Sequence, residues 1–293
     1  MPPIRKIGID VKPPAIESAK LLGELVDWLG QRNCQCVLAS TGAEVGLPLP
    51  CLPLEEMPEA VDIMIVLGGD GSLLHVSRRF IGSSVPIMGI NLGRLGFLTD
   101  IPVDGMFGVI DQVLQGNYTV ERRFSLIAET WRDGERVAVG TAINDVVMQR
   151  NQHPRMISFE MRLGDKFVFG LRADGLVLAT PTGSTAYALS AGGPIVHPSI
   201  DALSVVPVSP HTLSNRPILI PAEEVVELRL TESPALAALN LDGQEHQELQ
   251  EGDRVLVSRG DSVSLAFLPD RNYYEVLRSK LHWGGPVKAA DAR

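Results

Sequence analysis

The sequence predicts an α/β domain with a parallel sheet, followed by a predominantly β domain of packed sheets. Strand-like and helix-like segments alternate over residues 1–120, and strands that are separated by helices pair in parallel. Over residues 121–268 the segments become short, rich in Val, Ile and Leu, and separated by turns such as Asp133-Gly134. Residues 269–293 return to helical spacing, so we expect a helical tail that packs on the first domain.

Apolar periodicity gives the order of elements in the first domain. Strands are expected at residues 4–10, 34–39, 61–67 and 86–91, and helices at residues 14–31, from Ser72 onward and at residues 103–114. Prolines interrupt residues 47–58, which are therefore expected to form a loop. Ligands of open parallel sheets bind at the carboxyl ends of the strands, so the loops that follow these strands are the expected place for a site.

In the second domain, short apolar segments have the composition of strands. They are residues 124–131, 136–149, 157–163, 166–173, 175–180, 217–222, 225–230 and 254–260. Two adjacent polar residues, Asn144 and Asp145, interrupt the apolar pattern of one of these segments. The chain there either turns, forms a simple bulge or edge, or presents an amide and a carboxylate to a ligand.

Composition excludes several classes of function. The 293 residues are 45% hydrophobic, enough for a sizeable core, and the formal net charge of -9 argues against nucleic acid as the main partner. The sequence has no apolar run of about 18 residues and no basic-then-apolar start, so we expect a cytoplasmic protein that neither spans a membrane nor is exported. Cys34, Cys36 and Cys51 lack the spacing of a metal or redox site and are interpreted as idle thiols.

The turn Gly68-Gly69-Asp70-Gly71 follows the predicted strand at residues 61–67. Glycines let a backbone approach an anion, and a helix start offers free N–H groups, but a carboxylate at this place would repel phosphate. Asp70 is explained if it accepts a proton from a hydroxyl group or helps to hold a metal ion, which is the chemistry of a kinase. The alternative is a glycine-rich turn with an exposed Asp.

Two other phosphate-binding loops are excluded on chemistry. A Walker loop needs a lysine after its last glycine, and no lysine lies between Lys20 and Lys166. A Rossmann fingerprint needs G-x-G-x-x-G, which residues 68–73 do not supply. The phosphate charge must then be met by backbone N–H groups, by arginine, or by Mg²⁺ that arrives with a nucleoside triphosphate.

A second informative stretch is Pro-Thr-Gly-Ser-Thr-Ala-Tyr at residues 181–187, which directly follows a predicted strand. Small hydroxyl groups followed by an aromatic ring suit a ribose and a base. The alternative is a tight turn that caps a short helix, with Ser184 or Thr185 as the N-cap. The stretch has no G-x-S-x-G pattern, so acyl hydrolysis is disfavoured.

These motifs together resemble one family. GGDGSLL at residues 68–74, NLGRLGFLTD at 91–100, Asn144-Asp145 and DGLVLATPTGSTAYALSAGGPI at 174–195 closely resemble the NAD kinases, the ATP-dependent enzymes that make NADP from NAD. The GGDG turn is shared with lipid kinases and 6-phosphofructokinases, whereas the longest of these stretches is specific to NAD kinases. The resemblance implies a Rossmann-like, phosphofructokinase-like first domain, with NAD and Mg²⁺-ATP as substrates.

The resemblance also implies roles for individual residues. Asp70 would match the catalytic acid that takes the proton of the 2′-hydroxyl of the adenosine ribose as this oxygen attacks the γ-phosphorus of ATP. Asn144 and Asp145 would contact the adenosine part of NAD, and Asp174 the nicotinamide carboxamide. Tyr187 is the candidate for packing against a base. The further positions expected to contact NAD are Gly71, Arg155, Arg172, Thr185, Ala186, Ala188, Leu189, Ser190 and Gln244.

For Arg155 the alternative is a solvated loop charge, and for Gln244 a hairpin residue beside Asp242-Gly243. No metal site held by the protein alone is expected. The resemblance further implies a homodimer or homotetramer. Two rival functions stay open: a dinucleotide-binding sensor that has lost turnover, and, more remotely, a lipid or sugar kinase that shares the GGDG turn.

Overall fold

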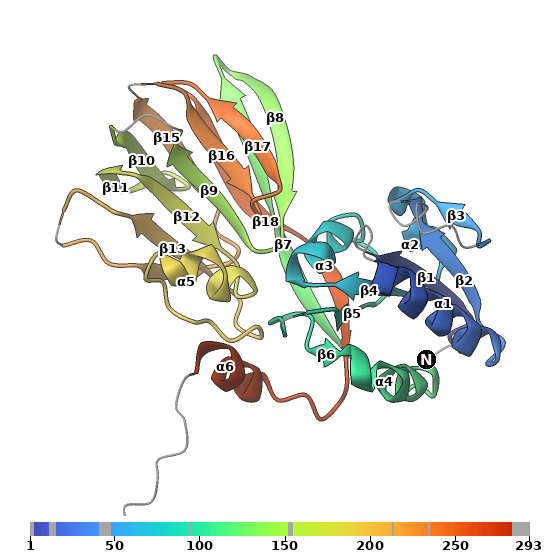
Figure 1. The fold of residues 1–293 in the computed structure, drawn as a ribbon. Coiled ribbons are helices and arrows are strands. Elements are labelled where there is room, and N and C mark those ends of the chain that lie inside the picture. The colour runs from blue at the N-terminus through green and yellow to red at the C-terminus, as the bar shows by residue number, and fades with distance from the viewer. Residues whose placement is uncertain are drawn as a thin grey trace, which may run out of the picture. The chain divides into compact units, whose positions relative to one another are not determined.

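The computed structural model describes residues 3–11, 16–40, 48–93, 95–151, 155–212, 214–233 and 235–282. The chain forms two compact units: unit 1 comprises Met1–Arg122 and Val263–Arg293, and unit 2 comprises Arg123–Ser262. Two long strands, β7 (Thr119–Arg132) and β18 (Arg254–Phe267), each begin in one unit and end in the other (Figure 1). Unit 1 is α/β and unit 2 is predominantly β, which confirms the fold class expected from the sequence.

Unit 1 is built on a parallel sheet. Its strands are β1 (Lys6–Val11), β2 (Gln35–Ala39), β3 (Cys51–Leu52), β4 (Ile63–Gly68), β5 (Ile87–Asn91) and β6 (Ile101–Pro102). They lie in the order β3-β2-β1-β4-β5, with β6 and the end of β18 both paired to β5. All six residues of β4 are buried, as expected for a parallel strand covered on both faces. The neighbouring strands β4 and β5 therefore end at the same edge of the sheet.

Unit 1 also contains helices. They are α1 (Ile16–Gly30), α2 (Met57–Ala60), α3 (Asp70–Ser77), α4 (Met106–Leu114) and, near the end of the described chain, α6 (Tyr273–Leu281). Leu22 and Leu25 of α1 and Ile110 of α4 share one apolar core with strand residues such as Ile9. Within the tail expected to be helical, α6 is capped by Asn272, which accepts a hydrogen bond from Tyr274 N at 3.0 Å.

Two expectations for unit 1 were wrong in detail. The helix expected from Ser72 begins two residues earlier, so Asp70 lies in its first turn. Residues 47–58, expected to form a loop, contain β3, a 3-10 turn at Leu54–Glu56 and the start of α2. Pro58 is tolerated because it lies in the first turn of α2, where a missing N–H leaves no helical hydrogen bond unmade.

Unit 2 contains two antiparallel layers. One has the strand order β14-β13-β12-β9-β16-β17, and the other runs β11-β10-β15-β18, with β7 paired to β18 and β8 paired to β7. The strands are β8 (Glu135–Ala142), β9 (Asp145–Arg150), β10 (Ile157–Leu163), β11 (Lys166–Ala173), β12 (Gly175–Ala179), β13 (Ala202–Val208), β14 (Ile218–Pro221), β15 (Val226–Glu232), β16 (Ala237–Leu241) and β17 (Glu245–Leu249). The segment at 136–149 thus turns between Ala142 and Asp145.

Side-chain alternation along β9 separates the core of unit 2 from its outer face. Val146 and Met148 point into the core that the two layers share, together with residues such as Phe159 from β10. Val147 faces the other way, into a smaller apolar cluster that includes Ala188 of α5 (Tyr187–Ser190). The short helix α5 therefore packs on the outer face of β9 at Val147.

Candidate active site

Asp70 lies where β4 passes into α3, and its carboxylate is held by the loop that follows the neighbouring strand β5. Oδ2 accepts a hydrogen bond from Phe97 N at 2.7 Å. Oδ1 accepts three, from Leu98 N at 3.1 Å, Thr99 N at 2.9 Å and the Thr99 hydroxyl at 2.9 Å. Because the carboxyl ends of neighbouring parallel strands meet at one edge of the sheet, residues almost thirty positions apart become partners.

The loop that holds Asp70 is itself fixed by Asn91 and by a glycine. Asn91 Nδ2 donates to Thr99 O at 3.2 Å and to Thr99 Oγ1 at 3.1 Å. A Cβ atom added at Gly96 would overlap Oδ1 of Asp70, so this loop approaches the carboxylate closely only because residue 96 lacks a side chain. The stretch at 91–100, singled out in the sequence without a role for its members, forms a cradle for the acid.

In unit 2, a second carboxylate organises the turn before β9. Asp242 adopts a positive φ of 54°, and its side chain accepts hydrogen bonds from Ile143 N at 2.9 Å, Asn144 N at 2.7 Å and Asp145 N at 3.1 Å. The hydroxyl of Thr180 donates to Ile143 O at 2.6 Å. These contacts make the Asn144-Asp145 interruption a defined turn with its backbone groups satisfied.

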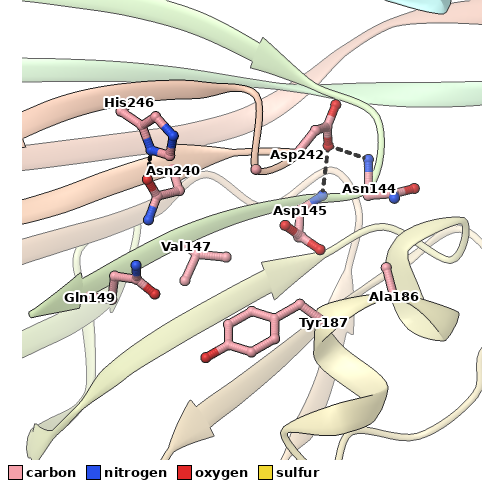
Figure 2. Close-up of a pocket in the computed structure, with 10 residues that line it drawn as sticks. Asn144, Asp145, Val147, Gln149, Ala186, Tyr187, Asn240, Asp242 and His246 are labelled. Atoms are coloured by element: carbon pink, nitrogen blue, oxygen red, sulfur yellow. Dashed lines mark hydrogen bonds between the residues drawn. The ribbon is translucent and has the colours of Figure 1, made fainter. Parts of the chain in front are cut away.

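The residues around this turn line a cavity of about 380 Å³ on the outer face of β9. Figure 2 shows the Tyr187 ring across the cavity from Val147 and Gln149. The lining residues are Asn144, Asp145, Val147, Gln149, Ala186, Tyr187, Asn240, Asp242, Gly243 and His246. Ligand sites are commonly cavities of roughly 300–1,000 Å³ with a few polar groups on a partly apolar wall. A ring flanked by amides and carboxylates fits the chemistry of a nucleoside.

Burial and a neighbouring acid perturb Asp145. Its residue is 5% exposed, and this burial, followed by the negative charge of Asp242, raises the pKa of the Asp145 carboxyl from 3.8 to about 7. Nearby, the side-chain oxygen of Asn144 is buried and has no hydrogen-bond partner among the described residues. A buried polar atom left in this state is a group available to a ligand.

The 181–187 stretch packs against the turn at Asn144 and forms part of the cavity wall. Gly183 approaches the Asn144 carbonyl so closely that an added Cβ would overlap it. Ser184 is fully buried, donates to Pro181 O at 2.7 Å and accepts from Val196 N at 3.0 Å. Neither Ser184 nor Thr185 makes a side-chain N-cap hydrogen bond, so the capping alternative is wrong. Of residues 185–190, Ala186 and Tyr187 line the cavity, while Thr185, Ala188, Leu189 and Ser190 do not.

The remaining predicted positions lie outside this cavity. Asp174 forms an ion pair with Arg150, at 2.6 Å between Asp174 Oδ1 and Arg150 Nε. Arg155, Arg172 and Gln244 are exposed in unit 2. Gly71 is exposed on the first turn of α3, in unit 1. Their roles toward a ligand stay predictions.

Several cavity residues escaped the sequence analysis. They are Val147, Gln149, Asn240 and His246, and Asp242 was noted only as a hairpin neighbour. The period-two alternation of β9 could have placed Val147 and Gln149 on the face opposite the core. Asn240 Oδ1 and His246 Nδ1 are hydrogen-bonded to each other on the adjacent hairpin, a pairing that alternation alone does not reveal.

Comparison with known proteins places the chain in a class and then in a family. Family models match the ATP-NAD kinase N-terminal domain over residues 53–118 and the ATP-NAD kinase C-terminal domain over residues 143–267. The class is therefore that of phosphotransferases with an alcohol group as acceptor. The chain is 40% identical to the NAD kinase of Magnetococcus marinus, over 97% of this chain and 95% of that protein, and 46% identical to the NAD kinase of Thiobacillus denitrificans, over 89% and 90%. The chain belongs to the NAD kinase family.

Solved structures agree with this assignment. Yeast NADH kinase complexed with NADH superposes with a TM-score of 0.89 at 25% identity, over 98% of this chain and 90% of that one. An NAD kinase from Archaeoglobus fulgidus in complex with ATP gives a TM-score of 0.74 at 22% identity, over 94% of this chain and 98% of that one, and this likeness concerns the fold. The prediction of NAD kinase activity is confirmed, and nothing favours the sensor or the lipid or sugar kinase.

Proposed function

We propose that Asp70 accepts the proton when this NAD kinase phosphorylates the 2′-hydroxyl of the adenosine ribose of NAD. The observation that best supports this role is that the two carboxylate oxygens of Asp70 accept different numbers of hydrogen bonds. Oδ1 accepts three hydrogen bonds, whereas Oδ2 accepts one and retains an acceptor position. The free position on Oδ2 is the one we assign to the substrate hydroxyl.

The reaction balances with Asp70 in this role. The 2′-oxygen forms a bond to the γ-phosphorus of ATP, the bond from that phosphorus to the β,γ-bridging oxygen breaks, and ADP leaves. The hydroxyl proton passes to Oδ2 of Asp70. Because phosphoryl transfer asks for little covalent chemistry from the protein, fixing the acceptor oxygen is the main contribution of this cradle.

The cavity of unit 2 is the proposed site for the adenosine part of NAD. Tyr187 offers a ring face for a base, and the unsatisfied oxygen of Asn144 can accept a hydrogen bond from a hydroxyl or amino group. Asp145 completes the polar wall. The yeast relative at 25% identity was solved with NADH, which supports a dinucleotide in this family's site.

Other contacts to NAD follow from the family motif. We propose that Asp174 binds the nicotinamide carboxamide, with Arg150 holding its carboxylate in place. The positions Gly71, Arg155, Arg172, Gln244 and residues 185–190 remain proposed contacts to the same substrate.

Mg²⁺ is proposed to arrive with ATP. Among the residues that the structure describes, no group of three or more His, Cys, Asp or Glu side chains could hold a metal ion. We propose a metal held mainly by triphosphate oxygens; Asp70 is the acid on the GGDG turn. Bound in this way, the ion would neutralise charge on the transferring phosphoryl group.

We further propose a cytoplasmic homodimer or homotetramer. No helix within the described ranges is long and apolar enough to cross a membrane. Apolar side chains exposed on strands of unit 2, such as Val139, Ile218 and Leu219, support subunit contacts through this unit.

The test is a coupled assay with purified protein, NAD and Mg²⁺-ATP. We expect one NADP and one ADP per phosphate transferred, and no phosphorylation of the NAD analogue whose adenosine ribose lacks the 2′-hydroxyl. Binding of NAD without any NADP formation would overturn the proposal and would favour a dinucleotide-binding sensor that has lost turnover.

A further inference from the structure

We infer that Arg271 is a positioning residue for Asp70, acting from the C-terminal segment through the loop that cradles the acid. The inference rests on the proposed role of Asp70. Arg271 lies just before α6, 201 positions beyond Asp70, and both belong to unit 1.

The side chain of Arg271 is largely buried, and its guanidinium contacts two acids, Asp100 and Glu121, as well as a backbone carbonyl and an aromatic ring. The side chain is 8% exposed and that of its ion-pair partner Asp100 is 14% exposed. Nε bonds Asp100, Nη2 donates to Phe97 O at 2.8 Å, and the guanidinium lies 3.8 Å from the ring centre of Phe267. A planar cation fixed on three sides holds the groups it contacts more rigidly than an exposed charge does.

The contact with Phe97 O reaches Asp70 through one peptide group. The carbonyl of Phe97 and the N–H of Leu98 belong to the same planar unit. Arg271 donates to the carbonyl, while the N–H donates to Asp70 Oδ1 at 3.1 Å. Hydrogen bonds in such a chain polarise one another, and the rigid plane fixes the direction of the N–H. Arg271 therefore strengthens the hydrogen bond from Leu98 N–H to Asp70 and fixes its direction.

A second cation from the same segment acts on the same loop. Lys280 of α6 donates to Leu95 O, and its ammonium lies 5.6 Å from the ring centre of Phe97. The peptide group of Leu95 carries the N–H of Gly96, which closes the loop by donating to Thr99 O at 2.9 Å. Two basic residues of the C-terminal segment thus hold the loop whose N–H groups hold Asp70.

A matched control exists in unit 1. Arg32 also lies over an aromatic ring, 3.4 Å from the centre of Trp28, and it pairs with Asp111 at 3.1 Å and donates to Trp28 O at 3.3 Å. None of these contacts involves the loop around Asp70. Arg32→Gln therefore removes a similar set of interactions without touching the acid.

The test compares Arg271→Gln and Arg32→Gln in NADP formation. Because misplacement of a reacting group by about 1 Å lowers rates by on the order of 100-fold, we expect Arg271→Gln to lower kcat between tenfold and 100-fold. The KM for NAD should stay within about threefold, since the cavity residues are untouched. Arg32→Gln should keep kcat within about twofold.

A double-mutant cycle separates positioning from general damage. In an Asp70→Asn background, Arg271→Gln should lower the residual rate by less than about threefold, because the group it positions is gone. An equal loss in both backgrounds would overturn the inference. If Arg271→Gln does not fold, the cycle is run with Arg271→Lys and with Lys280→Gln; no smaller loss in the Asp70→Asn background for either variant would likewise overturn it.

Discussion

Two carboxylates, one in each unit, have contrasting surroundings: hydrogen-bond donors surround Asp70, whereas Asp145 is buried beside another acid. Asp70 accepts four hydrogen bonds from residues 97–99, three of them from backbone N–H groups. Asp145 accepts none at its carboxylate from another described residue; it is buried, and Asp242 adds a second negative charge. The donors around Asp70 hold its carboxylate in place, whereas burial beside a like charge favours the protonated form of Asp145.

Proton transfer and substrate recognition therefore make different demands on an acid. An acid that must accept a proton is best fixed in position, and the cradle of unit 1 fixes the Asp70 carboxylate. An acid in a binding wall can remain protonated near neutrality and donate a hydrogen bond to a ligand, as the raised pKa of Asp145 implies. We therefore assign chemistry to Asp70 and recognition to Asp145.

The largest effect is expected from a side chain that fills the cradle of Asp70. Gly96→Ala places a methyl group on Oδ1 of Asp70, so the carboxylate or the loop must shift. We expect kcat to fall on the order of 1,000-fold, measured as NADP formation. Gly93→Ala is the control in the same loop, because its new Cβ would meet nothing closer than Asn91 Oδ1 at 4.0 Å. Equal rates in the two variants would show that the cradle is dispensable.

Removing the charge of Asp145 should change the stability of the protein in a pH-dependent way. Its raised folded pKa means that stability from this group is fully present below the unfolded value near 3.8 and is lost as pH rises through about 7. Asp145→Asn has no carboxyl group to titrate and does not lose this stability. Its free energy of unfolding should therefore exceed that of wild type by on the order of 3 kcal/mol at pH 8 and by much less at pH 5. Urea unfolding at both pH values measures the difference.

The control for that experiment is Asp165→Asn, which changes an exposed hairpin carboxylate. Its effect should be small and alike at pH 5 and pH 8. If Asp145→Asn also shifted stability equally at both pH values, the burial account of this acid would be wrong.

The turn beneath the cavity provides a third prediction. Gly183→Ala would push a methyl group into the carbonyl of Asn144, so we expect a loss of about 2 kcal/mol in unfolding free energy. NAD affinity should fall with it, because Asn144 moves. Gly170→Ala on β11 makes only ordinary contacts, the nearest at 3.8 Å, and should behave like wild type. Normal NAD affinity in a folded Gly183→Ala variant would argue against Asn144 as a ligand contact.

The smallest expected effect concerns the ring that faces the cavity. Tyr187→Ala should raise the KM for NAD about fivefold, in line with roughly 1 kcal/mol of ring contact, and leave kcat within about threefold. Tyr187→Phe keeps the ring and should match wild type in a steady-state titration of NAD. A larger loss in Tyr187→Phe than expected would assign the binding to the hydroxyl instead of the ring.

The sequence predicted those parts of the site that rest on local chemistry. Asp70 was recognisable because an acid contradicts a phosphate-binding turn, and Asn144-Asp145 because two polar residues interrupt an apolar strand. The fold class followed from the change in periodicity near residue 120. Each of these signals lies within a few positions along the chain.

Partners that are brought together by the fold were not predictable in the same way. Phe97, Leu98 and Thr99 reach Asp70 only because β4 and β5 are neighbours in the sheet. His246 and Asn240 reach the cavity through a hairpin far from β9 in sequence. The ion pair between Asp174 and Arg150 depends on the same antiparallel pairing of β9 and β12. In all three cases the contact depends on which strands pair and in what register, and the sequence leaves both open.

The most direct measurement is the single-turnover rate of NADP formation in Asp70→Asn and Asp145→Asn, with the dissociation constant for NAD measured on the same preparations. We predict a rate at least 100-fold lower in Asp70→Asn, with NAD affinity within about threefold of wild type. Asp145→Asn should keep a rate within about threefold. A normal rate in Asp70→Asn, or a loss accounted for by weaker NAD binding, would contradict the assignment of chemistry to Asp70.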